Sequence, residues 1–220
     1  MNIGCTRRRK QGAERTMNTI YRWMAPLALI LGTAVVPASA QNQAAFSTSY
    51  TLEYEMKYDR AAEVIKSLAD SGHEFARLRL GWLAYLAGRY NDSLNHYNLV
   101  LRANPNSIDG RLGLTLPLLV QKRWQEAATQ ARQVLATSPW DYTAHARLLV
   151  CEEGLKQWPQ LEAHAREIST MWGSDANALV YLARARVAQG NIAGARQAYA
   201  QVLERIPQHA ESLAFLKKNS

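Results

Sequence analysis

The side chains that could do chemistry after residue 40 are five histidines, two adjacent glutamates and one cysteine. The histidines are His73, His96, His145, His164 and His209. No two of them lie four residues apart and none has a neighbouring cysteine, so the short ligand spacings of a zinc site are missing. The sequence therefore predicts no metal site.

The remaining acids and nucleophiles do not form a catalytic set. Glu152 and Glu153 are adjacent, which on a helix turns their side chains about 100° apart, so they cannot act as a paired acid and base without a third residue. His164 could meet His145 across a helix pair, yet no nucleophile accompanies them. There is no glycine-rich phosphate loop and no GxSxG turn. We predict no catalytic residues, no cofactor and no enzymatic activity, with a hydrolase or a metal-binding protein as the least favoured alternatives.

Cys151 is the single cysteine after residue 40, so this part of the chain has no intramolecular disulfide. It follows Leu148 by three residues on the same apolar helix face. We interpret it as a small buried hydrophobic residue.

A 34-residue repeat organises the chain that carries these side chains. The stretch from Ala176 to His209 recurs three times upstream without a gap, as the leucines Leu182, Leu148, Leu114 and Leu80 show. The position that closes each unit holds Pro207, Gly173, Pro139 and Pro105. A period of this length indicates stacked helical units that cannot bury their apolar faces alone.

Residue types at the ends of the periodic segments place the helices. Ser107, Asp141 and Asp175 stand 34 residues apart as N-caps, and Gly88 and Gly190 suit left-handed helix ends. The predicted pairs are 74–88 with 91–104, 108–122 with 124–137, 142–156 with 158–171, and 176–190 with 192–205. A divergent helical hairpin is expected over 41–73 and a C-terminal capping helix within 210–220.

With these residues in place, the chain resembles the tetratricopeptide repeat family. The match rests on Leu80-Gly81 with Tyr90 and Tyr97 before Pro105, and on Ala183 with Ala195, Tyr199 and Pro207. It covers residues 74–209 as four units and residues 42–73 more weakly. The third unit is the least typical, with Leu149, Leu161 and Gly173 at positions that hold small residues or proline elsewhere. The resemblance implies an all-α, right-handed solenoid of antiparallel helix pairs, a tetratricopeptide superhelix, whose first helices line a concave groove.

The same resemblance assigns the residues that face the groove. They are Leu78, Trp82, Tyr85, Leu112, Leu116, Leu119, Val150, Glu153 and Arg184. Family members that clamp a terminal carboxylate have Lys and Asn where this chain has Leu78 and Trp82, so we expect a segment with bulky apolar side chains instead. The open alternative is that Phe46, Tyr50 or Tyr54 from the preceding helix already covers this surface.

The charge distribution and the N-terminus bear on partners and location. The net charge is +8, but residues 1–40 hold six of the basic residues and one acid, which leaves +3 for residues 41–220 and argues against nucleic-acid binding.

A 13-residue apolar run, Met24–Val36, is followed by Ala38-Ser39-Ala40. It is too short for a bilayer span, which takes about 20 residues. We interpret residues 1–40 as a signal peptide, with translation starting at Met1 or Met17 and cleavage before Gln41.

We therefore expect a periplasmic protein without a membrane span after cleavage, either free or held at the outer membrane by a partner. The favoured function is a non-enzymatic adaptor of the bacterial cell envelope that binds another envelope protein or a peptide segment in its groove. The alternative is a structural element that associates with a second copy of itself. The sequence does not name the partner or the pathway.

Overall fold

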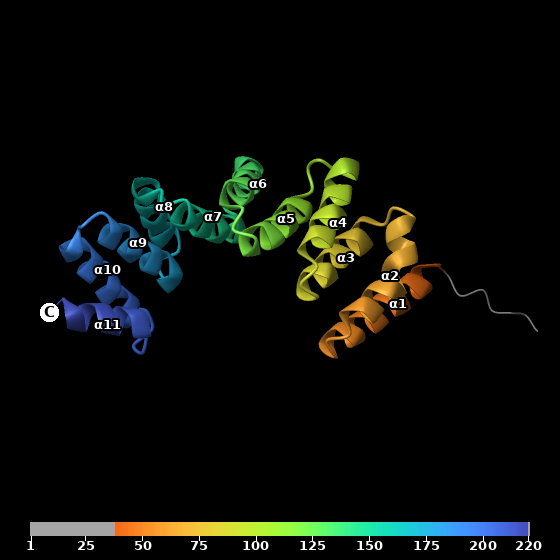
Figure 1. Cartoon of the computed structure of the whole chain (residues 1–220), viewed down its shortest axis with the longest axis horizontal. Coiled ribbons are helices and arrows are strands. Elements are labelled where there is room, and N and C mark those ends of the chain that lie inside the picture. The colour runs from red at the N-terminus through yellow and green to blue at the C-terminus, as the bar shows by residue number, and fades with distance from the viewer. Residues whose placement is uncertain (1–37, 220) are drawn as a thin grey trace, which may run out of the picture. The chain divides into compact units, whose positions relative to one another are not determined.

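The computed structural model describes residues 38–219, in which the chain forms eleven α-helices and no strand (Figure 1). The helices are α1 Ala38–Tyr54, α2 Tyr58–Asp70, α3 Glu74–Leu86, α4 Tyr90–Ala103, α5 Ile108–Val120, α6 Trp124–Thr137, α7 Tyr142–Gly154, α8 Trp158–Met171, α9 Ala176–Ala188, α10 Ile192–Arg205 and α11 Ala210–Lys218. Each odd-numbered helix up to α9 packs against the even-numbered helix that follows it, and that helix packs against the next pair. The predicted all-α solenoid of helix pairs is thereby confirmed.

The predicted signal peptide lies outside the described residues, except for its last three positions. Those positions, Ala38 to Ala40, form the start of α1. None of the helices in residues 38–219 is long and apolar enough to cross a membrane.

The first helices of the pairs begin at one kind of N-cap, repeated every 34 residues. Ser107 Oγ accepts from the Gly110 N–H at 3.2 Å, and Asp141 Oδ1 accepts from the Ala144 N–H at 2.7 Å, as predicted. Asp175 caps α9 by accepting from the Asn177 N–H, two residues on instead of three. The structure adds two caps at the same spacing, because the side chains of His73 and His209 accept from the backbone at the start of α3 and α11.

The first helices end two residues earlier than predicted, because the chain leaves the helix through a left-handed residue. That residue is Gly88, Lys122, Lys156 or Gly190, with φ of 74°, 57°, 57° and 79°. In each case the following N–H reaches back to the last turn, as from Arg123 to the Leu118 carbonyl at 2.9 Å. This closing turn satisfies carbonyls that the helix itself leaves free.

Close helix contacts in the first two repeats depend on glycine. The ring of Tyr97 in α4 is 3% exposed and lies against Gly81 of α3 and Gly113 of α5. A Cβ atom at these positions would stand 2.8 Å and 2.1 Å from the ring. In the third repeat the equivalent packing is different, because Leu149 and Leu161 fill the interior and are fully buried.

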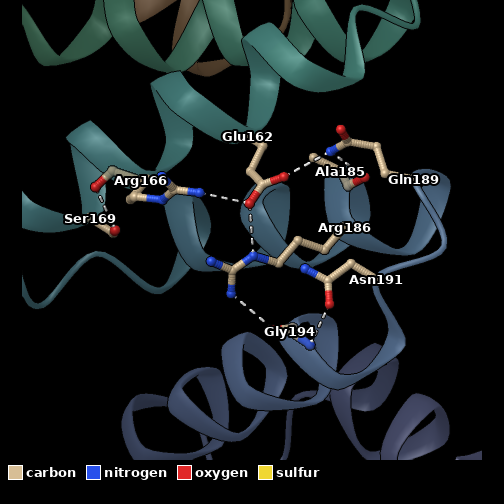
Figure 2. A network of polar contacts seen from close by, with 8 residues as sticks. All are labelled: Glu162, Arg166, Ser169, Ala185, Arg186, Gln189, Asn191 and Gly194. Carbon is tan, nitrogen blue, oxygen red and sulfur yellow. Dashed lines mark hydrogen bonds and ion pairs between the residues drawn. The ribbon is translucent and has the colours of Figure 1, made fainter.

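A half-buried carboxylate joins α8 to α9 in the C-terminal half, and one of its partners reaches α10. Glu162 of α8 accepts hydrogen bonds from Arg166 on its own helix and from Arg186 and Gln189 of α9, and Arg186 also donates to the Gly194 carbonyl of α10 (Figure 2). Burial acts to raise the pKa of Glu162, but these hydrogen bonds outweigh it and hold the pKa below its ordinary value. The carboxylate therefore stabilises the stacking of the third repeat on the fourth while it is ionised.

Candidate functional site

The nine residues predicted to face a groove all lie on first helices and are all half-buried. They come from α3 (Leu78, Trp82, Tyr85), α5 (Leu112, Leu116, Leu119), α7 (Val150, Glu153) and α9 (Arg184). These four helices contact one another in succession. We call the surface made by the nine residues the first-helix face.

The N-terminal end of this face is closed by polar contacts from α1. Glu53 accepts a hydrogen bond from the Trp82 indole N–H at 2.7 Å and pairs with Arg79 at 2.8 Å. The Arg79 guanidinium, which is buried, also donates to Ser49 and stacks on the Tyr50 ring at 3.6 Å. The sequence did not single out Glu53, since nothing in its residue type distinguishes it from the other acids of the hairpin.

Among the described residues, no ring of Phe46, Tyr50 or Tyr54 in α1 stacks on Trp82 or Tyr85. Phe46 packs against His73 and Phe75, with ring centroids 5.4 Å and 5.0 Å apart. Tyr54 is 91% exposed. The ring that stacks on Trp82 is Tyr85 of its own helix, at 5.6 Å.

The middle of the first-helix face is apolar. Leu78 and Leu119 pack against the buried cluster around Tyr97 and so have a structural role. Trp82, Tyr85, Leu112 and Leu116 are half-buried outside the core clusters. Two of these side chains come from α3 and two from α5, helices that pack against each other, so together they offer apolar surface that a partner segment could dehydrate.

A cation lies beside this apolar surface. Arg147 of α7 donates from Nη1 to the Leu112 carbonyl and to the Thr115 hydroxyl of α5. Burial lowers the pKa of Arg147, whereas Tyr97, Asp141 and Tyr85 act in the opposite direction. Arg147 was not among the residues predicted to face the groove, although it falls on the helix that also carries Val150.

The C-terminal end of the face is charged and internally paired. Arg184 donates to both oxygens of Glu211 in α11 at 2.8 Å and 2.6 Å, and to Glu153 at 3.3 Å. Tyr199 donates to the same Glu211 carboxylate at 2.6 Å. The hydrogen bond from Arg184 is the main cause that lowers the pKa of Glu211. Glu153 and Arg184, predicted as ligand contacts, therefore already bind each other and the capping helix.

The two histidines that could meet across a helix pair do meet, within a row of hydrogen-bonded side chains. His145 Nδ1 lies 2.9 Å from His164 Nε2, and His164 Nδ1 lies 2.9 Å from a Glu152 oxygen. The other nitrogen of His145 bonds the Pro139 carbonyl at 2.8 Å. Every nitrogen of the two rings is hydrogen-bonded within the protein, and this row of side chains holds α7 against α8.

Other catalytic and metal chemistry finds little support in the described residues. Burial raises the pKa of the Cys151 thiol to about 12, so it is no ready nucleophile. Within residues 38–219 no group of three or more His, Cys, Asp or Glu side chains could hold a metal ion.

Comparisons with known proteins agree with the helix pattern. Residues 51–108 and residues 177–209 each match the tetratricopeptide repeat. No curated protein matches the sequence.

Solved structures share the fold at low sequence identity. MamA from Desulfovibrio magneticus RS-1 superposes with a TM-score of 0.70 at 16% identity, over 77% of this chain and 97% of that one. YrrB, described as a tetratricopeptide protein with an unusual peptide-binding site, gives 0.67 at 15% identity over 79% and 90%. TTC0263, a thermophilic tetratricopeptide protein from Thermus thermophilus, gives 0.58 at 15% identity over 80% and 97%. The two repeat matches show that the chain contains tetratricopeptide repeats, and the solved structures share its fold.

Proposed function

We propose that the protein is a non-enzymatic adaptor that holds a segment of another protein on the first-helix face. The matches to the tetratricopeptide repeat support a role in protein interaction or scaffolding. The observation that carries the proposal is that Trp82, Tyr85, Leu112 and Leu116 are half-buried on the packed helices α3 and α5, between two salt-bridged ends. Aromatic and apolar anchors of this kind dominate binding energies at interfaces.

The charged pairs at the two ends of the first-helix face limit the part of it that a partner segment can occupy. Glu53 holds the N-terminal end, and Arg184 with Glu211 holds the C-terminal end. Buried or half-buried charges that are already paired gain little from a further partner, whereas apolar side chains gain from every contact that removes water. We therefore place the partner segment across α3, α5 and the start of α7.

We further propose that the adaptor works in the bacterial cell envelope. The support is the apolar run Met24–Val36 followed by Ala38-Ser39-Ala40, a pattern typical of a cleaved signal peptide. The intact mass of the protein from a periplasmic fraction tests this, with Gln41 expected as the first residue. Recovery of a membrane-bound product that retains Met24–Val36 would contradict it.

Capture with matched variants tests the adaptor role. Leu116→Ala removes an apolar contact from the first-helix face, and Gln125→Ala changes an exposed residue on α6. We expect Leu116→Ala to weaken capture of a partner from an envelope extract by about tenfold, which corresponds to about 1.4 kcal/mol, with helical circular dichroism preserved. Gln125→Ala should leave capture unchanged. Equal capture by both variants would contradict binding on this face.

Self-association remains the second candidate, because one end of the solenoid exposes large apolar side chains. At the turn between α1 and α2, Tyr54 is 91% and Met56 is 74% exposed. A second copy could cover them. Sedimentation over a range of protein concentrations separates the candidates, since a mass that rises with concentration and falls in Tyr54→Ser would favour self-association.

A further inference from the structure

Three arginines lie at the first-helix face, Arg79, Arg147 and Arg184, and they differ in whether they pair with a carboxylate. Arg79 pairs with Glu53, and Arg184 pairs with Glu153 and Glu211. Arg147 has no carboxylate partner among residues 38–219. Its contacts there are the Leu112 carbonyl and the Thr115 hydroxyl, both made by Nη1.

The geometry leaves one edge of the Arg147 guanidinium available. Nη1 is held by α5, while Nε and Nη2 have no hydrogen-bond partner in the described chain. Neither atom is among the unpartnered polar atoms that are sealed from solvent, so both keep some exposure. Nε and Nη2 carry parallel N–H groups, the arrangement that binds a carboxylate through two hydrogen bonds.

The surroundings of Arg147 strengthen its attraction for a negatively charged ligand. Arg147 lies against α5, which supplies Leu112 and Leu116, and Tyr85 is near enough to influence its charge. Burial lowers the pKa of Arg147, which reports the cost of holding this cation away from water. An ion pair in a partly desolvated site is stronger than one at an exposed surface.

We propose that Arg147 is an anion-binding site for an Asp or Glu side chain of the bound segment, flanked by bulky apolar residues that pack on Trp82 and Leu116. This inference rests on the proposed function and adds the chemistry of the partner. A side chain is favoured over a chain terminus, because Leu78 and Trp82 offer apolar surface where a terminal carboxylate would need further cations or amides. A nucleic acid is disfavoured, because the neighbouring cations on this face are already paired.

Selected peptides provide the probe. Random peptides displayed on phage are selected on the full chain, and a selected sequence is synthesised in three forms. These are an acidic form with an amidated C-terminus, the same peptide with its acidic residue replaced by Gln or Asn, and that neutral peptide with a free C-terminus. Each is titrated against wild type, Arg147→Gln and the control Arg102→Gln, which removes a charge from the exposed side of α4.

We expect the selected peptides to contain an acidic residue beside large apolar residues. The amidated acidic peptide should lose at least about tenfold in affinity on Arg147→Gln, which corresponds to the loss of one charge-assisted contact. Neutralising the peptide should cause the same loss in wild type and no further loss in Arg147→Gln. Arg102→Gln should bind as wild type does. The neutral peptide arm keeps the test valid even if Arg147→Gln folds poorly.

The contrary outcomes are distinct. Peptides that lose affinity on Leu116→Ala, but bind equally well in acidic and neutral forms, would overturn the anion site and leave the adaptor role standing. Full affinity of the neutral peptide with a free C-terminus would show that a chain terminus is the ligand and would overturn the side-chain assignment. Failure to select any peptide that depends on Leu116 would contradict the proposed function, and this inference with it.

Discussion

A single added methyl group at Gly113 tests how the first two repeats are packed. A Cβ atom there would lie 2.1 Å from Cε1 of Tyr97, whereas carbon atoms in contact need about 3.5 Å. The ring would have to move by more than about 1 Å. Its other side lies against Gly81, where a Cβ would also come as close as 2.8 Å, so there is little room to yield.

The size of the effect follows from two opposing contributions. Alanine is favoured over glycine inside a helix by about 1 kcal/mol. Overpacking a close-packed core costs about 1 to 3 kcal/mol and more where the neighbours cannot move. With Tyr97 held between two helices we take the upper end, so Gly113→Ala should lower the free energy of unfolding by about 2 kcal/mol. The melting temperature should fall by about 4 to 8 °C.

Urea unfolding followed by circular dichroism measures this change, with Gly173→Ala as the control. No atom lies within 4 Å of a Cβ at Gly173, so its substitution should alter the free energy of unfolding by less than about 0.5 kcal/mol. Tyr97→Leu in the Gly113→Ala background should cost less than it does alone, because the clash is relieved. A Gly113→Ala protein as stable as wild type would refute the packing of Tyr97 between α3 and α5.

Three further substitutions test the core, a helix end and a charge contact. Leu148→Ala removes a side chain that is 6% exposed and should lower the free energy of unfolding in urea by about 2 to 5 kcal/mol, whereas exposed Lys218→Ala should change it little. Lys122→Gly should raise the melting temperature, because it relieves a left-handed residue at φ 57° for a gain of about 0.5 to 1 kcal/mol; a loss would show that the Lys122 side chain stabilises the turn. The folded-state pKa of Glu162 is below its ordinary 4.5, so its contribution is present above that pH and is lost as pH falls through the folded-state value. Glu162→Gln should accordingly make unfolding less dependent on pH in the acid range, and an unchanged acid dependence would contradict the role of the carboxylate.

The repeat period made the fold predictable, because each helix pair reuses the same local signals. Ser107, Asp141 and Asp175 are residue types that favour N-caps, and the structure uses them so. His73 and His209 occupy the same position in the period and were missed, since histidine is not a preferred cap. The 34-residue period by itself places both histidines at cap positions.

The site was less predictable, because its charged contacts join helices distant in the sequence. Arg184 could be placed on the first-helix face from its position in the repeat, but its partner Glu211 comes from the capping helix 27 residues later. Glu53 reaches Trp82 from a hairpin that is off the 34-residue register. Arg147 is the converse case, since only the contacts of the folded chain show that it lacks a carboxylate.

The most direct test of the adaptor proposal is a measurement of where a bound partner touches the chain. A photo-activated cross-linking amino acid is placed at Leu116 on the first-helix face or at Thr129, an exposed residue of α6. We expect the captured partner to be cross-linked from Leu116 and not from Thr129, and Trp82→Ala to reduce the yield. Cross-linking from Thr129 with none from Leu116 would contradict binding on the first-helix face, because the partner would then bind the second helices.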